Sequence, residues 1–210
     1  MAYLEETARA GRTVEITRKY VSRYNQVCTG RGVKEKQTRP EVIKVNERIA
    51  ETKLRRLING NYGKGDIHAV LTYNNAMRPK TSEDARKRLQ NYTRSLRYHL
   101  EKEGLELRYI TATEYKRKRI HHHMIINAPM QMVKGLWRTG SVDVDYLDDS
   151  GQYGELARYL IKETQHSMHD KDAVFKKRWN ASRNLMKPEI ELKPIVRNGL
   201  RDVPVMPGYT

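Results

Sequence analysis

Three consecutive histidines lie in the stretch EYKRKRIHHHMIINAP, inside a run that otherwise has the composition of a buried β-strand. Side chains alternate across a strand, so His121 and His123 point to one face and His122 to the other. If the chain turns back through KRKR, Glu114 pairs with His121 and residue 112 with His123, and paired residues share a face. Two imidazoles and a carboxylate on one surface can hold a divalent metal ion that acts as a Lewis acid.

The middle histidine has a different expected role. A single histidine on the buried face of a strand is usually a hydrogen-bonded core residue, and we expect this of His122, although the sequence leaves open whether it replaces one of its neighbours as a ligand. The predicted register also carries weight, because a slip by one residue would send Glu114 to the opposite face of the sheet.

A helix predicted over residues 154–165, GELARYLIKETQ, carries the second group of chemically useful side chains. Tyr159 and Lys162 fall outside its apolar stripe and lie side by side at a spacing of three. A free phenol has a pKa of about 10, and a neighbouring ammonium favours the nucleophilic phenolate while neutralising phosphate charge. The stripe itself consists of Leu156, Ala157, Leu160 and Ile161.

Together these motifs resemble the HUH endonucleases, and among them the rolling-circle replication initiators of phages and plasmids. The family signature is two histidines separated by one residue on a strand, here HHH at 121–123, followed by a helix with Tyr and then Lys, here YLIK at 159–162. DIHAVLTY resembles the first motif strand of the family, and Glu114 resembles the acidic residue that precedes the histidines. This chain departs from the pattern in having His122 between the outer histidines and one tyrosine in the motif, because Tyr153 lies six residues before Tyr159.

The resemblance implies a metal-dependent nickase and strand transferase acting on single-stranded DNA. Mg²⁺ or Mn²⁺ would be held by His121, His123 and Glu114, and Tyr159 would attack the scissile phosphate to leave a 5′-phosphotyrosine and a free 3′-hydroxyl. Lys162 would offset the charge of the transition state. The expected substrate is an origin, in hairpin form.

The fold expected from the order of elements is α+β, with a central antiparallel β-sheet and flanking helices, and the resemblance relates it to the RNA-recognition or ferredoxin-like fold. We divide the chain into a basic N-terminal arm (1–39), a nicking domain with its leading helix (40–197) and a C-terminal tail (198–210). The predicted helices are 40–57, 81–104 and 154–165, and the predicted strands are 66–73, 105–115, 120–127 and 141–147, with a weak edge strand near 179–195.

The charge of the chain favours a polyanionic partner. Lys and Arg number 41 against 25 Asp and Glu, which gives a net charge of +16 and a pI near 9.9. We expect Lys116, Arg117, Lys118 and Arg119 to contact DNA beside the metal. The sequence shows no P-loop, so a host helicase is expected to accompany a host polymerase. With one cysteine, no secretion signal and no membrane partner expected, we predict a cytoplasmic protein of a bacterial host cell.

Several alternative functions share these features. A relaxase or a single-strand transposase uses the same chemistry. A non-cleaving origin-binding protein would not need Tyr159 and Lys162. A metal-independent RNA endonuclease would use a histidine as acid or base and leave no strand attached to the protein.

Overall fold

The computed structural model describes residues 2–21, 39–116, 119–164, 177–195 and 208. Its residues form two compact units, one of Met1–Asn61 with Met186–Thr210 and one of Tyr62–Leu185, here called unit 1 and unit 2. The described chain is α+β with two antiparallel sheets, which confirms the predicted fold class, although the sequence indicated one sheet. No helix in the described ranges is long and apolar enough to cross a bilayer.

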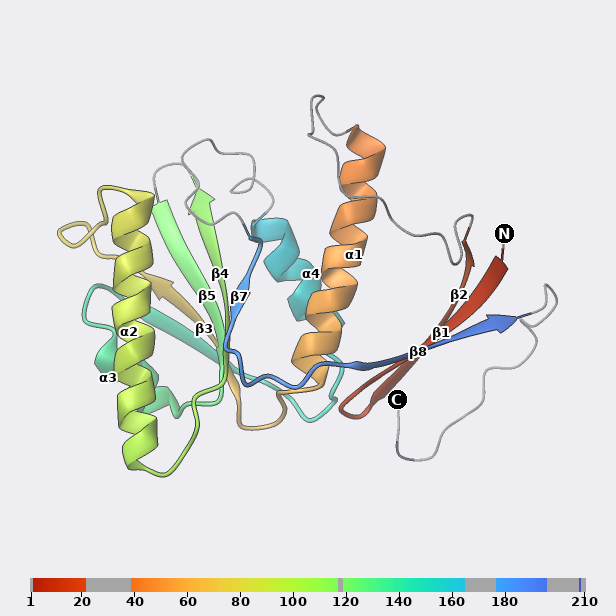
Figure 1. Ribbon diagram of the computed structural model, residues 1–210. Coiled ribbons are helices and arrows are strands. Elements are labelled where there is room, and N and C mark those ends of the chain that lie inside the picture. Colours follow the sequence, from red (N-terminus) through yellow and green to blue (C-terminus); the bar gives the residue numbers. More distant parts are fainter. Residues whose placement is uncertain (1, 22–38, 117–118, 165–176, 196–207, 209–210) are drawn as a thin grey trace. The chain divides into compact units, whose positions relative to one another are not determined.

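The elements follow one another as shown in Figure 1. The helices are α1 (Pro40–Asn59), α2 (Ser82–Lys102), α3 (Met130–Leu136) and α4 (Gly154–Glu163). The strands are β1 (Ala2–Ala10), β2 (Thr13–Val21), β3 (Ile67–Thr72), β4 (Tyr109–Lys116), β5 (Arg119–Ile126), β6 (Val142–Tyr146), β7 (Asn180–Ala181) and β8 (Glu189–Ile195).

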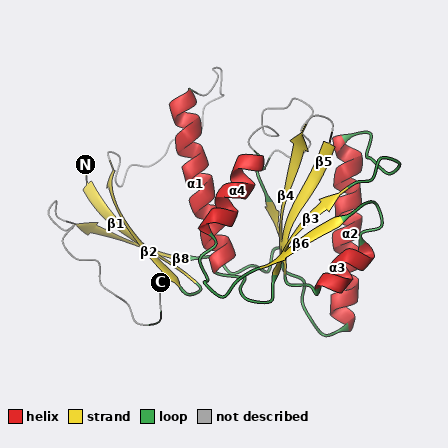
Figure 2. Ribbon diagram, turned by 180° about the vertical axis from the view of Figure 1, so that it is seen from behind, coloured by secondary structure: helices red, strands yellow, loops and turns green. Residues whose placement is uncertain are grey.

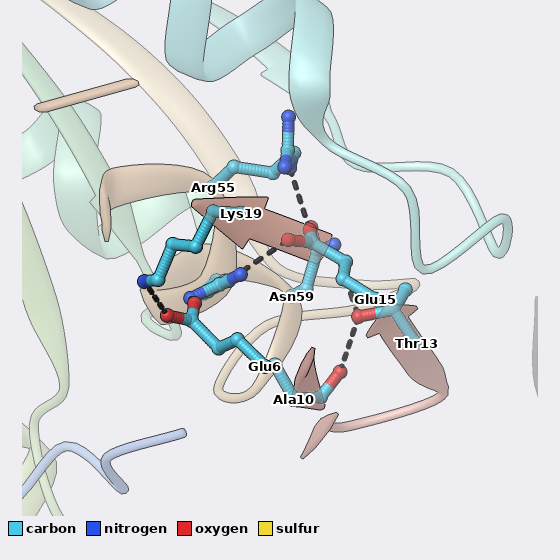
Figure 3. A network of polar contacts seen from close by, with 8 residues as sticks. Glu6, Ala10, Thr13, Glu15, Lys19, Arg55 and Asn59 are labelled. Atoms are coloured by element: carbon cyan, nitrogen blue, oxygen red, sulfur yellow. Dashed lines mark hydrogen bonds and ion pairs between the residues drawn. The ribbon is translucent and has the colours of Figure 1, made fainter. Parts of the chain in front are cut away.

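Unit 1 is a three-stranded sheet in the order β2-β1-β8, with α1 attached by a network of ion pairs. The guanidinium of Arg56 on α1 is almost fully buried and donates to Glu6 at 2.7 Å and to Glu15 at 2.8 Å, as Figure 3 shows around the glutamates. A hydrogen bond from Lys19 and contact with Arg56 lower the pKa of Glu6. Burial raises the pKa of Glu15, but hydrogen bonds from Arg55 and Arg56 outweigh it and leave that pKa below its ordinary value.

The prediction of an extended arm over residues 1–39 is therefore wrong for residues 2–21, which form the β1–β2 hairpin. The strands were missed because their buried face carries small or charged side chains such as Ala8, Ala10 and Glu6 in place of an aliphatic row. Gly11 makes the turn with φ +58°, where a Cβ would meet the Asn59 carbonyl oxygen. The structure also groups α1 and β8 with this hairpin, whereas we had assigned both to the nicking domain.

Unit 2 is a five-stranded antiparallel sheet in the order β6-β3-β5-β4-β7. Helices α2 and α3 cover one of its faces and α4 lies on the other (Figure 1 and, from behind, Figure 2). The core under α2 and α3 joins the inward residues of β3 and β5 to the apolar stripe of α2, and its fully buried members include Ile67, Leu71, Leu96, Met124 and Ile126.

The long helix of unit 2 has the boundaries that its sequence indicates. Thr81 is the N-cap, and its hydroxyl accepts a hydrogen bond from the backbone N–H of Asp84 at 3.1 Å. Leu89, Leu96 and Leu100 recur on one face and are buried, so α2 is fixed against the sheet along its length. This rigid layer leaves the opposite face of the sheet to carry the polar residues.

Candidate functional site

The β4–β5 hairpin has the predicted register. Glu114 pairs with His121 and Ala112 with His123, and the pairing continues to Lys116 opposite Arg119. Glu114, His121 and His123 therefore share the face of the sheet that α4 covers. The Nε2 atom of His123 lies 3.7 Å from a carboxylate oxygen of Glu114, and both side chains are buried.

The next strand adds a histidine that the sequence analysis did not identify. In β3, Val70 pairs with His123 and His68 with Ile125, so His68 is a diagonal neighbour of His123 on the same face. The two imidazole rings are stacked, with centroids 5.6 Å apart and planes inclined by 9°. A parity count along DIHAVLTY would have indicated this, but only after β3 was known to pair with β5.

Helix α4 brings the tyrosine to these rings. Ala157, Leu160 and Ile161 are buried, which leaves Tyr159 at 42% exposure on the flank of the helix, as predicted. The Tyr159 ring meets the His123 ring edge-on at 5.3 Å between centroids and the His68 ring at 6.2 Å.

Two further side chains of the same helix complete this end of the site. Lys162 is exposed, three residues after Tyr159. Glu163 follows on the next turn, and its charge raises the pKa of His123, so it too lies near the histidines. The sequence analysis did not identify Glu163, although its spacing of four from Tyr159 places it on the same side of the helix.

Burial keeps the site histidines neutral. It lowers the pKa of His123 to about 4, with a further contribution from His68. Burial likewise lowers the pKa of His68, against a smaller opposing effect of Asp145. A neutral imidazole has a lone pair available for a metal ion, whereas a protonated one does not.

His122 has the structural role that we expected. It is fully buried on the core face, where its ring nitrogens form hydrogen bonds with the Tyr73 hydroxyl at 2.8 Å and the Thr113 hydroxyl at 2.9 Å. Burial lowers its pKa to about 3. Tyr153 is also buried, and its hydroxyl donates to the Asp148 carbonyl at 2.8 Å, so it is not presented beside Tyr159.

Metal binding can be tested against the donors that are present. Among the described residues, no three His, Cys, Asp or Glu side chains already form a metal-binding arrangement. The donors nevertheless fit in kind, because both ring nitrogens of His123 and Nε2 of His68 are buried without a hydrogen-bond partner in the described chain, and the Glu114 carboxylate adjoins them. Binding would require these side chains to turn towards a common point.

The predicted DNA contacts of the hairpin loop cannot be placed. Arg117 and Lys118 lie outside the described residues, as do the side chains of Lys116 and Arg119. Their assignment stays a prediction from the sequence.

The strands and helix that form the site coincide with a known protein family. Residues 66–164 match a family model described as a replication-associated protein of the ORF2 type. The match covers 99 of the 210 residues and includes every residue from His68 to Lys162 named above for the site. It is consistent with a replication initiator. No curated protein and no solved structure matches the chain.

Proposed function

We propose that this protein is a metal-dependent, single-tyrosine endonuclease that nicks single-stranded DNA and starts rolling-circle replication. The observation that carries the proposal is the position of Tyr159, partly exposed and in ring contact with His123 on the face that also bears Glu114 and His121. The match to a replication-associated family supports the same conclusion.

In the proposed reaction, the phenolic oxygen of Tyr159 bonds to the phosphorus and the P–O3′ bond breaks. The phenol gives up its proton and the departing 3′-oxygen gains one, so a 3′-hydroxyl and a 5′-phosphotyrosine result. The phosphotyrosine retains an activated phosphodiester, and a 3′-hydroxyl can therefore reverse the reaction and rejoin the strand. The free 3′-hydroxyl can prime a polymerase of the host.

The other side chains bind and orient the substrate. When bound by His121, His123 and Glu114, Mg²⁺ or Mn²⁺ supplies a Lewis acid that polarises the phosphate. The buried rings of His68 and His123 support one side of the Tyr159 ring and keep water from that side of it. Lys162, exposed on the same helix, places its ammonium where charge grows on the phosphate oxygens.

The decisive experiment looks for the covalent product. The protein is mixed with a single-stranded hairpin oligonucleotide and Mn²⁺, and a slower protein–DNA band is sought on a denaturing gel. Tyr159→Phe should bind the DNA and form no adduct. Tyr98→Phe is the matched control, because Tyr98 is an exposed tyrosine on α2 that packs against Lys102.

The same assay separates the alternative functions. His121→Ala with His123→Ala should bind DNA and fail to cleave it. An origin-binding protein would give no adduct with the wild-type chain, and an RNA endonuclease would cut RNA and leave no strand attached. A fully active double histidine variant would refute the metal-dependent mechanism.

A further inference from the structure

We propose that His68 is a third imidazole ligand of the metal site, so that the bound ion is coordinated from β3 as well as from β4 and β5. This inference rests on the proposed function, since it concerns the same site. It starts from the position of His68, which the register places diagonally across from His123 and which is 7% exposed.

A purely structural role does not account for this imidazole. Its ring stacks on His123 and meets Tyr159, contacts that a phenyl ring would make equally well. Its Nε2, however, is buried without a hydrogen-bond partner in the described chain, and the adjacent His123 ring has two such nitrogens. Buried nitrogens of this kind normally have a partner, and several neutral imidazoles gathered beside a carboxylate match a cation in particular.

The neighbouring strand supplies a further feature of metal-binding histidines. Asp145 of β6 lies directly opposite His68 in the register, and its negative charge acts on that ring. Metal-bound histidines commonly have a carboxylate near the ring that fixes the orientation of the imidazole and increases its basicity. Asp145 is exposed and can take this role without being buried.

The geometry requires a limited movement. Two nitrogens on one ion can lie no more than about 4.2 Å apart, since metal–nitrogen bonds are about 2.1 Å long. The ring centroids of His68 and His123 are 5.6 Å apart. Rotation about χ2, a broad torsion in histidine, can bring nitrogens of the two rings closer without moving the strands.

A third imidazole also bears on which metal is bound. Mg²⁺ favours oxygen ligands, whereas imidazole donors favour first-row transition ions. A site with His68, His121 and His123 should therefore bind Mn²⁺ or Co²⁺ in preference to Mg²⁺. Removing His68 should reduce that preference as well as the affinity.

The test measures metal binding directly, without DNA. Mn²⁺ is titrated into the full chain, and free Mn²⁺ is followed by electron paramagnetic resonance. The variant His68→Phe keeps an aromatic ring against His123 and removes the nitrogens, and its thermal unfolding is recorded alongside. We expect at least a tenfold loss of Mn²⁺ affinity, a smaller loss for Asp145→Asn, and no change for the control His99→Phe, whose ring contacts Ser95 on α2.

Folded His68→Phe with wild-type Mn²⁺ affinity would overturn the proposal. If His68→Phe does not fold, Asp145→Asn decides, and unchanged affinity in that variant would overturn it. The nickase proposal fails separately, when the wild-type chain binds Mn²⁺ but forms no DNA adduct. Tyr159→Phe should bind Mn²⁺ like the wild type, which keeps the two results distinguishable.

Discussion

Replacing His122 or His123 by leucine should have opposite effects on stability, although the two residues are adjacent. His122→Leu removes two hydrogen bonds, at 2.8 and 2.9 Å, and leaves the Thr113 hydroxyl without that partner in the core. At about 1 kcal/mol for each lost bond, and more for a buried group left unsatisfied, the expected cost is about 2–4 kcal/mol. For a unit of this size that lowers the midpoint of thermal unfolding by roughly 8–16 °C.

His123→Leu replaces a buried imidazole whose nitrogens have no hydrogen-bond partner in the described chain. Leucine removes that penalty at similar volume, so the free energy of unfolding should stay the same or rise by about 1 kcal/mol. Nicking should be lost in His123→Leu, whereas the folded fraction of His122→Leu should retain it. Circular dichroism melts and the adduct assay together measure both effects.

The two variants also differ from the wild type in their response to acid. Burial lowers the pKa of His122 to about 3 and that of His123 to about 4, whereas an unfolded histidine titrates near 6.5. Between these values the unfolded chain binds more protons, so stability is present above about pH 6.5 and is lost as the pH falls. Each leucine variant should show a weaker pH dependence in urea unfolding between pH 7 and pH 5. Equal melting temperatures for the two variants would refute the assignment of the histidines to different faces.

Three further predictions concern unit 1 and the tyrosine helix. Arg56→Met should destabilise unit 1 by about 2 kcal/mol in urea unfolding, because Glu6 and Glu15 lose a buried partner; since both glutamate pKa values lie below 4.5, the wild type should lose stability as the pH falls below about 4.5, and this variant should lose less. Gly11→Ala should cost about 2 kcal/mol or more by thermal melting, because its Cβ would lie 2.2 Å from a backbone oxygen at a positive φ. Lys162→Met should slow adduct formation roughly tenfold in single-turnover kinetics while the free energy of unfolding stays unchanged, since this side chain is exposed.

The sequence predicts the site hairpin well because strand geometry is strict. Alternation fixed the faces of His121, His122 and His123, and the short KRKR turn fixed the partner of Glu114. The helical spacing of Tyr159 similarly predicted a side chain on the flank of α4. These are local relations, and they follow from element type alone.

The features that the sequence did not predict depend on contacts between distant segments. His68 joins the site only because β3 pairs with β5, and no local pattern states that pairing. Unit 1 was missed for a related reason: its β1–β2 hairpin buries few large apolar side chains and relies on Arg56, which comes about forty residues later. Propensity and periodicity do not register an ion pair of that kind.

The pairing of β1 with β8 has a consequence for biosynthesis. Tyr3 pairs with Ile195, so the sheet of unit 1 closes only after nearly the whole chain has left the ribosome. Unit 2 is one continuous segment, Tyr62–Leu185, and can assemble before β8 is made. The segment that carries the catalytic candidates is thus expected to fold first, and the beginning of the chain waits for its last strand.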